Sequence, residues 1–209
     1  MRSPRIWRLL ISAALAVLAW WSLQSQNVPE PARQPAVENQ TTRREGHIPA
    51  ADTYMLHGEI VNVADGDTVT LRAGTARHRV RLASIDAPET GSDGRPGQPH
   101  GRAAADALRS LVQGRTLDLR CYETDQYGRD VCDLLEDNAD RQTYNARMVE
   151  AGWAWANMQG RGRHLRDDSL RTVERQARQA RRGLWADADP VPPWQWRYDC
   201  WQQQRCGSR

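Results

Sequence analysis

The sequence predicts an α+β domain in which five short strands close into a small barrel and three helices gather at one end. Runs of alternating apolar and polar residues recur between turn residues, and segments with apolar residues at three- and four-residue spacing follow them. The chain has 209 residues, of which 39% are hydrophobic and 26% charged, as in one soluble domain with additional segments. No internal repeat is present, which excludes a solenoid.

The first three strands are indicated by alternation. They cover Gly58–Val63, Thr68–Leu71 and His78–Leu82, with the turn residues Asp65-Gly66 and Ala73-Gly74 between them. Because these connections are short, we expect three sequential antiparallel strands.

Two more strands follow later in the chain. They cover Thr116–Tyr122 and Asp130–Leu135, and the tight turn 125–129 joins them. A second hairpin of this kind supplies the strands needed to close a small barrel.

Apolar spacing predicts three helices. The first follows a Gly/Pro-rich loop at residues 91–99 and stops at Gly114. The second covers Tyr144–Ala151, and the third covers about Asp167–Arg182, with acids at its start and arginines at its end, as the helix dipole favours.

The charge of the chain is unevenly placed. All 29 fixed cations are arginines, and three of them (Arg2, Arg5 and Arg8) lie in the first 24 residues, which contain no acid. The other 26 arginines balance the 26 acidic residues. A strongly basic nucleic-acid coat is therefore excluded, and any phosphate binding must come from local placement of charge.

The N-terminal segment predicts export. Residues 1–23 combine the three arginines with an apolar stretch, Leu9–Leu23, and are typical of a cleaved signal peptide or of an inner-membrane anchor over residues 6–23; both alternatives stay open. Residues 24–52 are rich in proline and polar residues and predict a flexible linker. We expect a folded domain over 53–186 and a Trp/Cys-containing tail over 187–209, in the periplasm or outside the cell.

Four cysteines agree with export. Cys121 and Cys132 lie on the two strands of one predicted hairpin, and Cys200 and Cys206 lie close together in the tail. Two local disulfides are expected in an oxidising compartment. The alternative for the first pair is two small buried apolar side chains.

Three motifs concentrate the chemistry: Asp65-Gly66-Asp67-Thr68, the run from Arg81 to Thr90 that contains Asp86-Ala87-Pro88-Glu89, and Tyr127-Gly128-Arg129. Each alone is a common turn or strand end. In this order and at this spacing, together with Arg181-Arg182-Gly183-Leu184-Trp185, they resemble the staphylococcal nuclease (thermonuclease) family. The resemblance covers about Tyr54 to Trp185.

The resemblance implies a five-stranded OB-fold barrel with three helices and a calcium-dependent phosphodiesterase site. It places Ca²⁺ on Asp67, Asp86 and the backbone carbonyl of Ala87, the phosphate clamp on Arg81 and Arg129, and on Glu89 either a general base or an orienting carboxylate. These residue types suit the task, because Ca²⁺ takes oxygen ligands and arginine donates two parallel hydrogen bonds to phosphate.

The sequence departs from the family pattern around the substrate. Gln126 stands where the family has a lysine, which leaves Tyr127 to bind that end of the substrate. No clear equivalent of the base-stacking tyrosine is present, and Trp155 is a possible substitute. Residues 161–182 hold eight arginines against three acids, a pattern that fits either a nucleic-acid track or a solvated helix face.

The sequence therefore predicts an exported, monomeric nuclease that cleaves DNA and RNA with low sequence specificity and favours single strands. The family resemblance implies that it depends on Ca²⁺ and leaves 3′-phosphate products. The alternative is a non-catalytic OB-fold module that binds nucleic acid or tethers to the envelope and carries a structural calcium site. Arg81, Glu89 and Arg129 favour the enzyme, because a structural metal needs neither a phosphate clamp nor a base.

Overall fold

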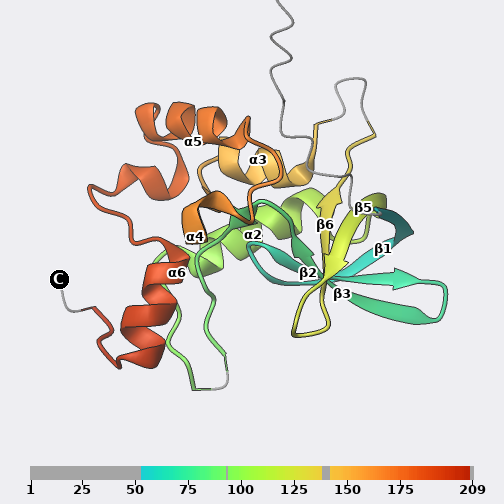
Figure 1. Cartoon of the computed structure of the whole chain (residues 1–209), viewed down its shortest axis with the longest axis horizontal. Coiled ribbons are helices and arrows are strands. Elements are labelled where there is room, and N and C mark those ends of the chain that lie inside the picture. The colour runs from blue at the N-terminus through green and yellow to red at the C-terminus, as the bar shows by residue number, and fades with distance from the viewer. Residues whose placement is uncertain (1–52, 93, 138–141, 208–209) are drawn as a thin grey trace, which may run out of the picture. The chain divides into compact units, whose positions relative to one another are not determined.

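A computed structural model describes residues 53–92, 94–137 and 142–207 (Figure 1). The predicted signal or anchor segment and the linker over 24–52 lie outside the described residues. Within the described ranges no helix is both long and apolar enough to cross a membrane.

Five strands form a closed barrel in the order β1-β2-β3-β6-β5, which confirms the predicted fold class. The strands are β1 (Tyr54–Asp65), β2 (Thr68–Ala73), β3 (Ala76–Leu82), β5 (Thr116–Thr124) and β6 (Asp130–Leu134). Antiparallel pairing of β1 with β5 and parallel pairing of β3 with β6 close the barrel. Alternate residues point inward and form a continuous apolar core, in which Leu71, Val80, Leu82, Leu119 and Leu134 are almost completely buried.

Both expected disulfides are present. Cys121 and Cys132 face each other directly across β5 and β6 and are joined, so the bond ties the hairpin inside the core. Cys200 and Cys206 are also joined, six residues apart in the C-terminal segment.

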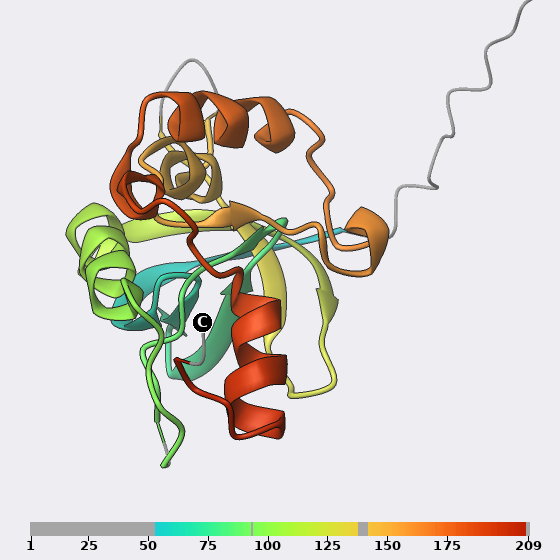
Figure 2. The same ribbon diagram turned by 90° about the vertical axis from the view of Figure 1, so that its left-hand side faces the viewer.

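The three main helices are α2 (Gly101–Val112), α3 (Tyr144–Glu150) and α5 (Leu170–Gln179); α2 and α3 pack on the barrel, and α5 packs on α3 (Figure 2). The last is shorter than the sequence predicts. At its start the Asp167 carboxylate accepts a hydrogen bond from the Ser169 N–H (2.9 Å), which forms a turn before the helix. After Ala180 the chain leaves the helix at Arg181, whose φ is +52°.

Several short elements were not expected from the sequence. Strand β4 (Ile85–Asp86) pairs with β7 (Trp155–Ala156), and a single turn, α4 (Gln159–Gly162), follows. The chain then passes through η1 (Gly183–Ala186) into α6 (Pro193–Trp196) and the π-helical η2 (Arg197–Gln202). Residues 193–202 of the predicted tail are thus helical. Two-residue strands and single helical turns leave too little periodicity to be seen in a sequence.

Candidate active site

The turn between β1 and β2 presents the first carboxylates of the site. Asp65 ends β1, Gly66 follows, and Asp67 precedes β2 and is 3% exposed. Gly66 has no room for a side chain, since a Cβ there would lie 2.7 Å from the Ala87 Cβ and 2.8 Å from the Ala104 Cβ. The glycine therefore brings this turn against the segment that carries Asp86.

The end of β3 and the short β4 present the next groups. Arg81 pairs with Thr68 across β2 and β3, which places its guanidinium beside the β1–β2 turn. Ser84 turns the chain with φ +66°, and Asp86 in β4 is completely buried. On α3, the buried Asn145 amide donates to the Ala83 carbonyl (2.9 Å) and the Cys132 carbonyl (3.1 Å). These bonds hold the end of β3 to β6 and fix where β4 begins.

Arg81 brings the two predicted metal carboxylates together. Its Nη2 atom lies 2.8 Å from Asp86 Oδ1 and 3.2 Å from Asp67 Oδ2. The Ala87 backbone N–H also donates to Asp67 Oδ2 (2.9 Å). This N–H contact is what the structure shows for Ala87, and its carbonyl as a metal ligand stays a prediction.

Arg197 joins this cluster, although the sequence did not indicate it. From the start of η2 it donates through Nη2 to Asp86 Oδ2 (2.7 Å) and through Nη1 to Asp86 Oδ1 (3.0 Å) and Glu89 Oε1 (2.7 Å). One signal was available in the sequence. A tail that contains a short-range cysteine pair and several tryptophans is typical of a folded segment, which indicates that it packs on the domain.

Glu89 lies at the edge of the cluster. Its backbone carbonyl accepts from the Gln98 N–H (2.8 Å), and a Cβ on Gly101 would lie 2.1 Å from the same oxygen, so the loop 91–99 and the start of α2 pack directly on it. Burial and the charge of Asp67 raise the pKa of Glu89. A carboxyl with a raised pKa accepts protons more readily than an exposed one.

The other acids titrate differently. Burial and the charge of Asp67 raise the pKa of Asp65 well above its usual range. Burial also acts to raise the pKa of Asp67, but the Arg81 charge and the Ala87 N–H outweigh it, and the pKa is lowered. Burial therefore dominates the pKa of Asp65, whereas the ion pair with Arg81 and the hydrogen bonds together dominate the pKa of Asp67.

Arg129 does not touch the acid cluster. It pairs with Asp125 across the β5–β6 turn, with Nε 2.8 Å and Nη2 2.7 Å from Asp125 Oδ2, and its guanidinium lies 5.4 Å from the Tyr127 ring centre. Tyr127 is 69% exposed at the tip. Tyr127 is thus exposed to solvent at the tip, whereas the Arg129 side chain is only 17% exposed and is held by Asp125.

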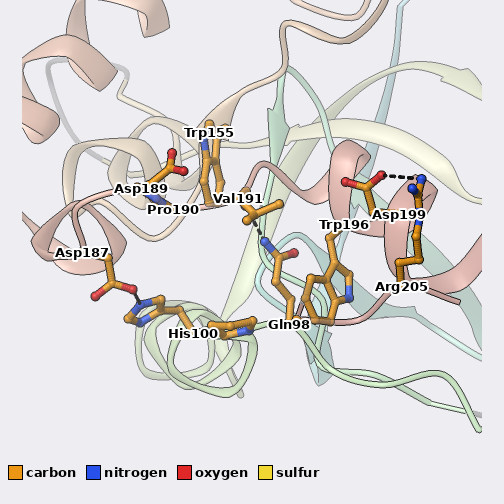
Figure 3. A pocket seen from close by; sticks show the side chains of 12 residues that line it. Gln98, His100, Trp155, Asp187, Asp189, Pro190, Val191, Trp196, Asp199 and Arg205 are labelled. Carbon is orange, nitrogen blue, oxygen red and sulfur yellow. Dashed lines mark hydrogen bonds and ion pairs between the residues drawn. The ribbon is translucent and has the colours of Figure 1, made fainter. Parts of the chain in front are cut away.

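Trp155 is not placed to stack a base, which corrects the sequence-based expectation. It is 3% exposed and meets Trp185 edge-on, with ring centres 5.0 Å apart. Its remaining surface faces a pocket shared with Gln98, His100 and the C-terminal segment (Figure 3). Strand β7 pairs Trp155 with Asp86 through the backbone, whereas the ring packs in a cluster with Ala177, Leu184 and Trp185.

The carboxylates fit a hard divalent cation. Among the described residues, no group of three or more His, Cys, Asp or Glu side chains is arranged to hold a metal ion. Asp67 and Asp86 nevertheless both contact the Arg81 guanidinium, so the two carboxylates lie close together. Calcium takes its remaining ligands from carbonyl groups and water, so two carboxylates suffice.

The barrel and its acid–arginine cluster define an OB-fold protein of the nuclease class. Residues 79–187 match the family described as staphylococcal nuclease homologue, and the chain belongs to this family. The match begins inside β3, so β1 and β2 lie before it.

Similar proteins bear nuclease names. The chain is 40% identical over 143 residues to a protein of Escherichia coli O157:H7 named "Uncharacterized endonuclease", covering 68% of this chain and 86% of that one. It is 35% identical over 148 residues to a micrococcal nuclease of Shigella flexneri, covering 68% and 80%. It is 32% identical over 182 residues to a "Probable staphylococcal-like nuclease" of Oryza sativa subsp. japonica, covering 84% and 50%.

Proposed function

We propose that this protein is an exported, Ca²⁺-dependent nuclease that hydrolyses DNA and RNA with low sequence specificity and leaves 3′-phosphate ends. The observation that carries the proposal is the pair of buried carboxylates, Asp67 and Asp86, bridged by the guanidinium of Arg81. This arrangement combines a cation site with a phosphate-binding group in one place.

Asp67, Asp86 and the Ala87 carbonyl would hold the calcium ion. When bound, calcium supplies polarisation of the scissile phosphate and a site for water. Arg81 donates two hydrogen bonds to the phosphate oxygens as negative charge grows on them, and a positioned donor of this kind contributes about 10²–10³ in rate. Glu89 orients the attacking water and accepts its proton at a carboxylate oxygen.

The proposed low sequence specificity follows from the part of the nucleic acid that the site contacts. Arginines contact phosphates, which carry no sequence information, so the site does not select bases. In this proposal Arg129 is the second arginine that contacts the phosphate. The neighbouring Tyr127 ring, which is exposed, stacks on a base. We propose that single strands are favoured, because their backbone and bases are accessible without duplex opening.

Export rests on the sequence and on the disulfides. Residues 1–23 carry the signal or anchor pattern, and both cysteine pairs are oxidised in the structure. We also propose that the protein acts as a monomer.

The test is cleavage of a labelled single-stranded oligonucleotide by the full chain in Ca²⁺ and in EDTA. We expect cleavage in Ca²⁺ alone and fragments whose 5′-hydroxyl ends accept phosphate from polynucleotide kinase without prior phosphatase treatment. Asp67→Asn should abolish cleavage, because the site loses one of two charged oxygen ligands. Binding without cleavage by the wild-type protein would instead support the non-catalytic module.

A further inference from the structure

Arg197 occupies the position of a cation in the acid cluster. Its two terminal nitrogens engage both oxygens of Asp86, and one of them also reaches Glu89. Asp86 is completely buried, so its charge depends on the cations that touch it, which are Arg197 and Arg81. Arg197 therefore neutralises the carboxylate that calcium would require.

The rest of the C-terminal segment holds Arg197 in place. The indole N–H groups of Trp196 and Trp201 both donate to the Pro96 carbonyl, at 3.4 Å and 3.0 Å. Arg95 lies 5.1 Å from the Trp201 ring centre, and the Cys200–Cys206 disulfide closes the end of the segment.

The loop beneath the segment also carries Gln98, whose side chain donates to the Val191 carbonyl. Figure 3 shows this contact beside Trp196 and the Asp199–Arg205 pair. The placement of Arg197 thus comes from contacts distributed along residues 191–206, on the loop that follows Glu89.

We propose that Arg197 is a third active-site arginine that occupies Asp86 in place of the metal while it also binds Glu89, so that calcium binds only by displacing it from Asp86. This inference rests on the calcium dependence proposed above. A divalent ion and a guanidinium on the same buried carboxylate repel each other strongly, because little solvent screens them. Binding of one therefore weakens binding of the other by the same factor.

The test is a calorimetric calcium titration of the full chain without nucleic acid, which reads metal affinity independently of catalysis. Arg197→Gln should tighten calcium binding by roughly 5- to 100-fold, the usual range for coupled sites. Arg197→Lys should give an intermediate affinity, because lysine keeps the charge but lacks the bidentate fork.

The matched control is Arg205→Gln, which removes the same charge from the same segment near Asp199. It should change calcium affinity by less than about twofold, because screening weakens exposed charges at a distance. An equal gain from both glutamine variants would overturn the proposal, since the effect would then come from net charge alone.

A double variant, Cys200→Ser with Cys206→Ser, keeps Arg197 and loosens the segment, so it should also tighten calcium binding, by a smaller factor. It covers the case in which Arg197→Gln fails to fold. If the wild-type protein binds calcium and neither Arg197→Gln nor the double cysteine variant binds it more tightly, only this inference is overturned. Absence of calcium binding in every variant overturns the calcium dependence as well, whereas binding that appears only in Arg197→Gln supports displacement directly.

Discussion

Two arginines on one carboxylate illustrate how single residues define this site. Arg81 and Arg197 both contact Asp86 Oδ1, but Arg81 also reaches Asp67, whereas Arg197 also reaches Glu89. The pKa of both guanidinium groups is raised, because attraction to these carboxylates outweighs burial. Each arginine stays charged, and the two differ in the acids they bridge.

Arg81→Lys should lower kcat by at least about 100-fold, because lysine cannot donate two parallel hydrogen bonds to the phosphate in the transition state. Calcium affinity should change far less, since Asp67 and Asp86 remain. Single-turnover cleavage beside a calcium titration measures both quantities. Arg102→Lys, at an exposed position of α2, is the control and should cleave at the wild-type rate. A near wild-type rate for Arg81→Lys would remove Arg81 from the phosphate clamp.

At the scale of elements, the site depends on how closely the β1–β2 turn approaches β4 and α2. Gly66 allows this approach, and the Ala87 and Ala104 methyl groups fill the space beside it. The same barrel presents β3 to solvent on its outer face. Arg77 and Arg79 are exposed there, on the same side of the strand as Arg81, because alternate residues share a face.

Gly66→Ala should lower the free energy of unfolding by about 1–3 kcal/mol through overpacking. It should also weaken calcium binding, because the added methyl group pushes Asp67 away from Asp86. Denaturant unfolding and calorimetry measure the two effects. Gly74→Ala, at φ +61° in an open turn, loses stability away from the site and should leave calcium affinity unchanged. Equal calcium affinity in the two variants would contradict this role of Gly66.

The outer arginines of β3 predict the path of the substrate. Arg77→Gln with Arg79→Gln should weaken single-stranded DNA binding in EDTA and reduce the slope of log K against log salt by about 1.4, or about 0.7 for each lost phosphate contact. The control, Arg171→Gln with Arg175→Gln, removes equal charge from the exposed face of α5. If only the control pair changed the slope, the single-stranded DNA would run along α5 and not along β3.

At the scale of the whole molecule, we propose that the folded domain cleaves nucleic acid and that the N-terminal segment directs export. The first described strand begins at Tyr54, so removal of residues 1–52 takes away none of the described elements. Both cysteine pairs are joined, which agrees with the proposed export, because disulfides persist in oxidising compartments.

Deletion of residues 1–52 should therefore leave the cleavage rate per molecule unchanged and keep the protein in the cytoplasm. The full chain should appear in the periplasm, the inner membrane or the medium. Cell fractionation with an activity assay on each fraction measures both outcomes. A deletion variant that misfolds, or a full chain that stays cytoplasmic, would refute this division of tasks.

The sequence by itself determined the barrel strands, the three main helices and the motifs that carry Asp67, Arg81, Asp86, Glu89 and Arg129. Local alternation and motif spacing encode these features, because each depends on neighbouring residues. Only the tertiary structure decided that Trp155 is buried, that Arg129 pairs with Asp125 and that Arg197 lies on Asp86. The Arg197–Asp86 contact joins residues 111 positions apart, and it depends on a helix of one turn and a disulfide-closed segment. Local sequence patterns do not predict a contact over such a distance in the chain.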